Sequence, residues 1–264
     1  MNTDGTGYIP LRSFTNSDGY LPRAGLTLSG SVLFGTAVSG GSSNVGTVFK
    51  LNTDGTGYTV LKNFTRSDGA LPYADLTLSA NTLYGTTYQG GSSNVGTVFK
   101  LNTNGTGYAV LKNFTGSDGA YPYAGLALSG NVLYGTTYFG GSSNLGTVFK
   151  VNTDGTGYTV LKNFTGGDGA NPYAGLTLSG SALYGTTSGG GNLGEGTLFK
   201  LDLSAPRLTI QSVGNAVVLN WSNPAFALQA APSVTGVYTN IAGATSPYTN
   251  AVTGEQEFFR LIGN

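Results

Sequence analysis

The stretch Leu51–Lys100 reads LNTDGTGYTVLKNFTRSDGALPYADLTLSANTLYGTTYQGGSSNVGTVFK. It returns at Leu101–Lys150 with 40 of 50 positions identical, and further copies fill Met1–Lys50 and Val151–Lys200. No insertion separates the copies, so the period is 50 residues throughout. A fixed period of this length indicates one supersecondary unit that is repeated and stacked on its neighbours.

Each copy contains four short segments with the composition of strands. In one full set they are Leu76–Ser79, Thr82–Tyr88, Gly96–Asn102 and Tyr108–Phe114. β-branched and aromatic residues fill these segments, whereas Gly, Asn, Asp, Ser and Pro fill the breaks between them. Four antiparallel strands in 50 residues predict an all-β fold made of β-propeller blades. A β-solenoid is the alternative, but its coils are shorter and lack hairpin turns.

The phase of the repeat predicts how the blades are completed. The first strand, Tyr8–Phe14, is a fourth strand with no preceding three, and the last set, at about 176–202, has no fourth strand. We therefore predict four four-stranded blades, with the N-terminal strand closing the last one, because closure removes open sheet edges. The rival arrangement is self-association, in which this strand completes a blade of a neighbouring chain.

The repeats end near Asp202 and a different sequence follows. We divide the chain into a repeat domain, residues 1–202, and a C-terminal module, residues 203–264. Short strand-like segments with turn residues between them fill the module, which predicts a small β-sandwich with Trp221 in its core.

The repeats also resemble known families. A strand that runs into Gly-Gly, followed by a strand with an aromatic residue such as Phe99, resembles a kelch blade, although the kelch-type Trp is absent. The motifs LYGTT-x-x-GG, GTVFKLNTDGTGY and VLKNFTGSDGA-x-P more closely resemble the bacterial GloVer tandem repeats. That resemblance implies a secreted or surface-anchored protein. The family has no established enzymatic activity that could be transferred to this chain.

Composition excludes several classes of function. The 264 residues include 44 Gly, no His and no Cys, and 12 basic residues balance 12 acidic ones. Zinc sites, Cys nucleophiles and the Ser-His-Asp triad are therefore excluded. A net charge of zero without basic clusters argues against nucleic acid as a partner. No apolar run approaches 18 residues, so we expect no membrane span.

One acidic residue recurs in every copy, in the loop between the fourth strand of one set and the first strand of the next. The four positions are Asp18, Asp68, Asp118 and Asp168. An Asp-Gly turn explains them, because Asp supplies a side-chain bend and Gly a positive φ. The alternative is a circle of carboxylates at one mouth of a ring, which would hold Ca²⁺. The motif NTDGTG at Asn52–Gly57 lacks the glutamate of a calcium loop and predicts a hairpin turn.

Aromatic residues at the strand ends are the candidate ligand-binding groups. They are Tyr73, Tyr123 and Tyr173 in the PYA motifs, and Tyr88, Tyr138 and Phe139 beside the Gly-Gly loop. Packing between blades explains them structurally. Otherwise they stack on sugar rings, with Asn94 and Asn144 as nearby hydrogen-bonding groups.

We expect a non-enzymatic, secreted or cell-surface scaffold that binds a glycan or a surface protein, with its leader absent from this sequence. One alternative is a structural protein that self-assembles by strand exchange into a filament or surface layer. A glycan-active enzyme is the least favoured alternative, because it needs two repeat aspartates facing each other across a channel.

Overall fold

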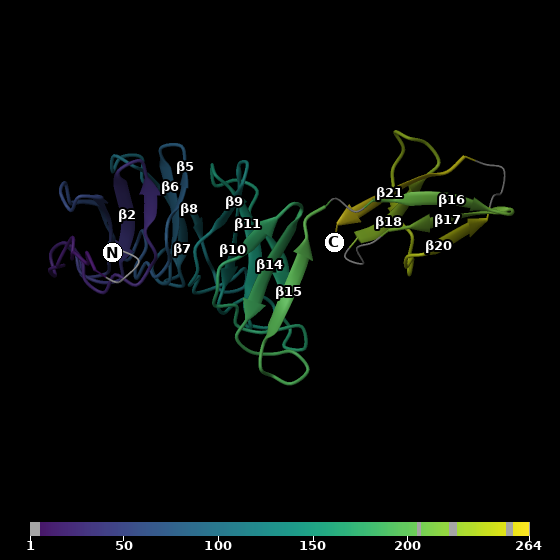
Figure 1. Ribbon diagram of the computed structural model, residues 1–264. Helices are drawn as coiled ribbons and strands as arrows, with labels where there is room; N and C mark the ends of the chain where they lie inside the picture. The colour runs from purple at the N-terminus through teal and green to yellow at the C-terminus, as the bar shows by residue number, and fades with distance from the viewer. Residues whose placement is uncertain (1–5, 205–206, 222–225, 252–255, 264) are drawn as a thin grey trace. The chain divides into compact units, whose positions relative to one another are not determined.

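The computed structural model describes residues 6–204, 207–221, 226–251 and 256–263 (Figure 1). Every regular element in these ranges is a β-strand, and they include no helix that could cross a membrane. The chain divides into two compact units, residues 1–202 and residues 203–264.

The first unit is a series of antiparallel sheets, or blades, whose strands pair in chain order. Blade 1 consists of β1 (Thr27–Ser29), β2 (Val32–Ala37), β3 (Thr47–Asn52) and β4 (Thr59–Asn63). Blade 2 consists of β5 (Thr77–Ser79), β6 (Thr82–Thr87), β7 (Thr97–Asn102) and β8 (Ala109–Asn113). Blade 3 consists of β9 (Ala127–Ser129), β10 (Val132–Thr137), β11 (Thr147–Asn152) and β12 (Thr159–Asn163). Blade 4 consists of β13 (Thr177–Ser179), β14 (Ala182–Thr187) and β15 (Thr197–Asp202). The predicted all-β fold of four-stranded propeller-type blades is thus confirmed for the first three copies.

Turn chemistry fixes these strand boundaries. The hairpin from β5 to β6 turns at Ala80, whose φ is 49°, and Gly130 and Gly180 take the same place with φ of 55° and 57°. In the turn from β3 to β4, the Asp54 carboxylate accepts a hydrogen bond from the Thr56 amide at 2.9 Å. Asn104 accepts the same bond at 3.0 Å in the next copy, so this motif is a hairpin turn as predicted.

Phenylalanine pairs join neighbouring blades. Phe64 at the end of β4 packs on Phe99 of blade 2 with ring centroids 5.3 Å apart, and Phe114 packs on Phe149 at 5.1 Å. All four rings are fully buried. Crowding at these rings explains the glycine in LYGTT, since a Cβ on Gly85 would lie 2.6 Å from the Phe99 ring. The blade joint, more than the single sheet, therefore contains the hydrophobic core.

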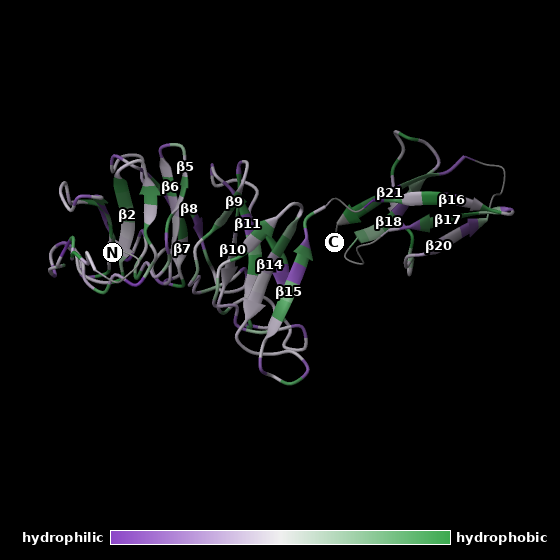
Figure 2. Ribbon diagram, in the orientation of Figure 1, coloured by the Kyte–Doolittle hydropathy of each residue, from purple (hydrophilic) through white to green (hydrophobic). Residues whose placement is uncertain are grey.

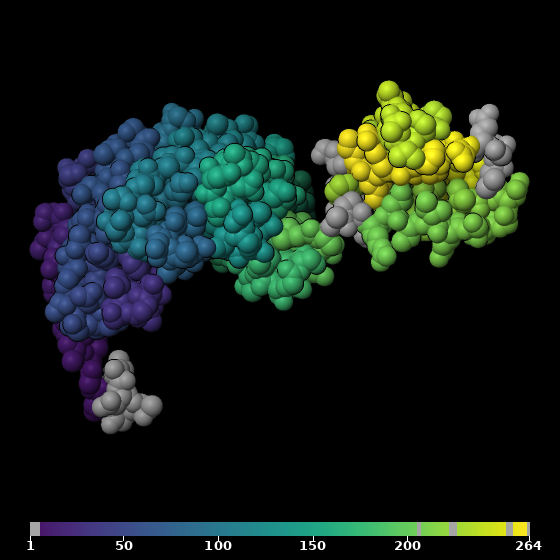
Figure 3. Space-filling view, turned by 90° about the horizontal axis from the view of Figure 1, so that it is seen from above, coloured from purple at the N-terminus to yellow at the C-terminus, as the bar shows by residue number. Residues whose placement is uncertain are grey.

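Threonine hydroxyls add polar contacts to each joint. Thr36 of blade 1 donates to the Ala74 carbonyl at 3.0 Å, and Thr86 of blade 2 donates to the Ala124 carbonyl at 3.1 Å. The acceptors lie in the linkers that lead into the next blade. Figure 3 shows the repeats following one another, from the purple first repeat to the green blade 4.

The N-terminal segment does not close the last blade, contrary to our prediction. Residues 8–14 form no strand, and β15 pairs only with β14 among the described residues. Phe14 instead packs on Phe49 of blade 1 at 5.1 Å, in the way Phe64 packs on Phe99. This contact holds the segment at the blade 1 end of the series, while β15 lies at the opposite end (Figure 3).

Blade 4 therefore ends the series with an open sheet edge. No residue of β15 is fully buried: Thr197, Phe199 and Leu201 are partly buried, and the residues between them are exposed. Figure 2 shows hydrophobic and hydrophilic residues alternating along this strand. Leu198 is 80 % exposed, whereas its counterparts Val48 and Val98 are fully buried.

The second unit contains two three-stranded sheets. One holds β16 (Thr209–Val213), β17 (Ala216–Asn220) and β20 (Tyr248–Ala251). The other holds β19 (Thr239–Asn240), β18 (Phe226–Ala231) and β21 (Phe258–Gly263). Leu219, Trp221 and Leu228 form its buried core, to which both sheets contribute. Trp221 therefore lies in the core, where the sequence predicted it.

Candidate binding site on an aromatic patch

The linkers between blades place the tyrosines of the PYA motifs. Each linker first docks on the preceding blade, where the Tyr121 amide donates to the Val95 carbonyl at 2.7 Å. Tyr121 adopts a φ of 57°, and the following Pro122 lies over Gly96. A Cβ on Gly96 would lie 2.6 Å from the Pro122 Cδ, so only glycine fits beneath the linker. This docking fixes where Tyr123 leaves the backbone.

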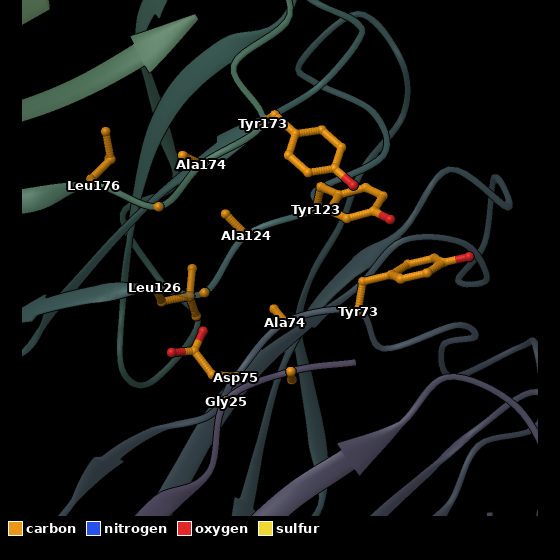
Figure 4. Close-up of a pocket in the computed structure, with 13 residues that line it drawn as sticks. Gly25, Tyr73, Ala74, Asp75, Tyr123, Ala124, Leu126, Tyr173, Ala174 and Leu176 are labelled. Carbon is orange, nitrogen blue, oxygen red and sulfur yellow. The ribbon is translucent and has the colours of Figure 1, made fainter. Parts of the chain in front are cut away.

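Tyr73, Tyr123 and Tyr173 stack on one another and form what we call the tyrosine ladder (Figure 4). The Tyr73 and Tyr123 ring centroids are 4.6 Å apart at 16°, and those of Tyr123 and Tyr173 are 4.0 Å apart at 30°. The Arg23 guanidinium lies 5.8 Å from the Tyr73 ring at one end of the ladder. Both faces of the Tyr123 ring are therefore occupied, whereas Tyr173 is 49 % exposed.

Four more aromatic side chains extend the ladder into a continuous aromatic patch. Tyr88 lies 5.5 Å from Tyr73 and 4.9 Å from Tyr121, and Tyr138 lies 6.0 Å from Tyr173. Phe139 connects Tyr138 with Tyr121 at 4.6 and 6.2 Å. Apart from the exposed Tyr173, these side chains are half-buried. The aromatic patch thus consists of Tyr73, Tyr88, Tyr121, Tyr123, Tyr138, Phe139 and Tyr173.

Two hydroxyl groups of the patch, those of Tyr173 and Tyr88, have raised pKa values. A hydrogen bond with Tyr123 raises the pKa of Tyr173 to about 12. Burial raises the pKa of Tyr88, and its tyrosine neighbours act in the same direction. Tyr88 and Tyr173 therefore present neutral hydroxyls at neutral pH, which both donate and accept hydrogen bonds.

A cavity of about 510 Å³ lies beside the ladder. Small side chains of the linkers line much of it, among them Ala74, Ala124 and Ala174 (Figure 4). Asp75 supplies the one carboxylate of this lining. The volume falls within the range typical of small-molecule sites, and the lining residues leave room for a ligand group against the tyrosines.

The asparagines predicted as hydrogen-bonding groups of the site stabilise the turns of their own loops. The Asn94 side chain accepts a hydrogen bond from the Gly90 amide at 3.1 Å, and Asn144 accepts one from the Gly140 amide at 3.0 Å. Both residues have φ near 55°, a left-handed conformation that asparagine tolerates. Their recurrence in the repeat follows from this turn.

The recurrent aspartates brace their own loops. Asp68 pairs with Lys62 and accepts a hydrogen bond from the Thr65 amide at 2.9 Å. The same arrangement recurs at Asp18 with Arg12, Asp118 with Lys112 and Asp168 with Lys162. In the parts of the chain that the structure describes, no group of three or more acidic side chains could hold a metal ion. The four carboxylates are not gathered into the predicted circle.

One patch residue, Tyr121, was missing from the predicted site. Tyr121 occupies the position of Leu71 and Asn171 in other copies, so the repeat pattern did not indicate it. The signal that could have found it is its position two residues before Tyr123 in the same linker.

The family follows from the repeats. The chain matches the Gloeobacter/Verrucomicrobia repeat over residues 1–135 and again over residues 108–238. It belongs to this family. No curated protein matches the chain. The closer of the two resemblances seen in the sequence is therefore confirmed, and the kelch resemblance is not.

Several solved structures are similar to this Gloeobacter/Verrucomicrobia repeat protein at low identity. The nidogen/laminin complex shares 18 % identity with a TM-score of 0.45, covering 72 % of this chain and 68 % of that one. TolB from Acinetobacter baumannii shares 12 % identity with a TM-score of 0.39, covering 83 % of this chain and 49 % of that one. The phage phi92 endosialidase shares 16 % identity with a TM-score of 0.44, covering 81 % and 39 %. The fold assignment rests on the strand pairing described above.

Proposed function

We propose that this protein is a non-enzymatic binding scaffold whose aromatic patch binds a carbohydrate. The observation that carries the proposal is the gathering of seven aromatic side chains into one half-exposed cluster across blades 2 to 4. Contiguous apolar surface of this kind typically marks an interaction site. Tyrosine suits such a site, because it combines a large apolar face with a polar tip.

The chemistry of the patch favours an uncharged, hydroxyl-rich ligand. In Figure 4 the hydroxyls of Tyr73, Tyr123 and Tyr173 point to the same side. Arg23 and Asp75 are the charged groups beside the ladder, one at its end and one in the cavity. A sugar ring has apolar C–H groups for the exposed Tyr173 face and hydroxyls for the tyrosine tips. The stacked faces of Tyr123 leave Tyr173 as the ring on which a sugar can lie.

Two further parts of the proposal concern catalysis and location. Each recurrent aspartate is ion-paired within its own repeat, and this supports binding without hydrolysis. An extracellular or cell-surface site of action, with a role in adhesion, is supported by the likeness of the repeats to secreted bacterial proteins.

A glycan array followed by titration calorimetry tests the proposal. We expect binding to at least one neutral polysaccharide, weakened about fivefold in Tyr173→Ala, since an aromatic contact contributes on the order of 1 kcal/mol. Tyr8→Ala is the matched control, because Tyr8 is 73 % exposed and lies in the N-terminal segment, outside the aromatic patch. The proposal would be overturned if no glycan on the array bound, or if wild type and Tyr173→Ala bound with equal affinity.

A further inference from the structure

The N-terminal segment makes the contacts that the end of a fourth strand makes in the other repeats. Phe14 packs on Phe49 at 5.1 Å and on Tyr58 at 6.0 Å, as Phe64 packs on Phe99 at 5.3 Å and Tyr108 at 6.2 Å. The Tyr58 hydroxyl donates to the Asp18 carbonyl at 2.7 Å, as Tyr108 does to Asp68 at 2.6 Å. Residues 8–18 thus occupy blade 1 as the end of a preceding blade would.

Blade 4 is the complement of that segment, because the described residues pair three strands in it and no fourth. Leu198 on its open face is 80 % exposed, although Val48, Val98 and Val148 at this position are fully buried. Thr186 is exposed, whereas Thr36, Thr86 and Thr136 are 2 % exposed and donate to the linker of the next blade. Blade 4 therefore has joint-type residues on a face that no neighbouring blade covers.

The first blade shows the same mismatch on its opposite face. Leu26 is 56 % exposed, whereas its counterparts Leu76 and Leu126 are 4 % and 7 % exposed. Leu21 is 46 % exposed. Both ends of the series therefore present leucines that burial in a joint would remove from water.

Opposite charges occur at the two ends and replace neutral residues of the inner copies. Glu195 in blade 4 stands where the inner copies have Val45, Val95 and Leu145. Arg23 at the first blade stands where later copies have Tyr73, Tyr123 and Tyr173. The two ends of the series thus carry opposite charges in addition to their exposed leucines, and opposite charges favour contact between them.

We propose that a second copy of this chain covers the open face of blade 4. Residues 8–14 of one copy add to β15 of the other as its fourth strand, and blade 1 packs on blade 4. This inference goes beyond the proposed carbohydrate binding but shares a residue with it, because by the 50-residue period Arg23 of the covering copy falls beside Tyr173, as Tyr173 falls beside Tyr123. Because the two faces differ, the contact is head-to-tail, and each copy keeps one face free for the next.

The repeat predicts the register of this joint. In blade 1, Thr47 pairs with Asn63, Val48 with Lys62 and Phe49 with Val60, with a bulge between Val48 and Phe49. Transferred by the 50-residue period, Thr197 pairs with Ser13, Leu198 with Arg12 and Phe199 with Pro10. Pro10 then falls beside the bulge, where a strand tolerates proline.

Light scattering over a concentration series tests the joint. We expect wild type to form species of two or more chains as concentration rises, and Leu198→Asp or Leu26→Asp to stay monomeric. Both variants change side chains that are 80 % and 56 % exposed, so the fold is kept. An equimolar mixture of the two variants should give dimers, because each supplies one intact face. Leu193→Asp is the matched control, since Leu193 is 89 % exposed and its counterparts Ser43, Ser93 and Ser143 are exposed too.

A disulfide distinguishes the second copy from closure within one chain. The chain has no cysteine, so Ser13→Cys with Thr197→Cys places a single pair at the predicted register. Crosslinked dimers and larger species on oxidation support the proposal. An oxidised monomer with an internal disulfide would overturn it in favour of ring closure. Wild type that stays monomeric at every concentration, or that associates equally well with Leu198→Asp, also overturns it.

Discussion

The joint between blades 2 and 3 and the two ends of the blade series contain the same kinds of residue in different surroundings. Val98 is fully buried in the inner joint, but Leu198 at the same position of blade 4 is 80 % exposed. Leu126 is 7 % exposed, and Leu26 is 56 % exposed. A blade does not bury its own apolar face, so its neighbour decides which side chains leave water.

The largest expected difference is between a buried joint residue and its exposed counterpart. Phe114→Ala should lower the free energy of unfolding by about 3 to 5 kcal/mol, because it removes a fully buried ring that packs on Phe149. Leu198→Ala should change it by no more than about 0.5 kcal/mol. Urea unfolding at low protein concentration measures both. Equal losses in the two variants would contradict the comparison.

The sequence predicts the inside of a blade well, because a blade is a local structure. The break at Ala80-Asn81 and the NTDGTG turn each specify a hairpin through a few adjacent residues, and the strands follow. The position of Gly85 is explained once Phe99 is known to lie across from it. Family membership follows from the same short sequence motifs.

The ends and the site were harder to predict, because both depend on contacts between copies. Residues 8–14 have the sequence of a fourth strand, yet no rule of local sequence states which sheet they join. The recurrent Asp68 was a candidate metal ligand until the structure placed Lys62 against it. The tyrosine ladder needed the spacing between Tyr73 and Tyr123, which is a property of the blade joint.

An intermediate effect is expected where a polar contact crosses the joint. The Tyr108 hydroxyl donates to the Asp68 carbonyl at 2.6 Å, and Lys62 lies 4.2 Å from the ring. Burial raises the pKa of Tyr108, so the hydroxyl remains a donor well above neutral pH. Tyr108→Phe should lower the free energy of unfolding by about 1 kcal/mol, the typical net contribution of one hydrogen bond.

The control for Tyr108→Phe is the same change at the open end. Tyr58 donates to the Asp18 carbonyl at 2.7 Å, but this carbonyl belongs to the N-terminal segment, which has no sheet of its own. Tyr58→Phe should therefore cost less than Tyr108→Phe in the same urea titration. A larger loss in Tyr58→Phe would mean that the N-terminal segment is anchored as firmly as an inner strand.

The smallest effect is expected in the loop ion pairs and depends on pH. Burial of the Asp168 carboxyl opposes its ionisation, but Lys162 and Thr165 outweigh this and lower the pKa below the usual 3.8. The folded state therefore binds this proton less readily than the unfolded chain. Its stabilisation is present above about pH 4 and is lost as the pH falls through the lowered pKa.

Asp168→Asn should lower the free energy of unfolding by no more than about 0.5 kcal/mol at pH 6, since both side chains are 37 % exposed and solvent screens the pair. The difference from wild type should vanish near pH 2. Asp68→Asn should cost more, because the Lys62 and Asp68 side chains are only 18 % and 24 % exposed inside the series. Asp75→Asn is the control, as Asp75 has no salt bridge among the described residues. Equal losses at positions 68 and 168 would show that the open end shields its ion pair as well as an inner joint does.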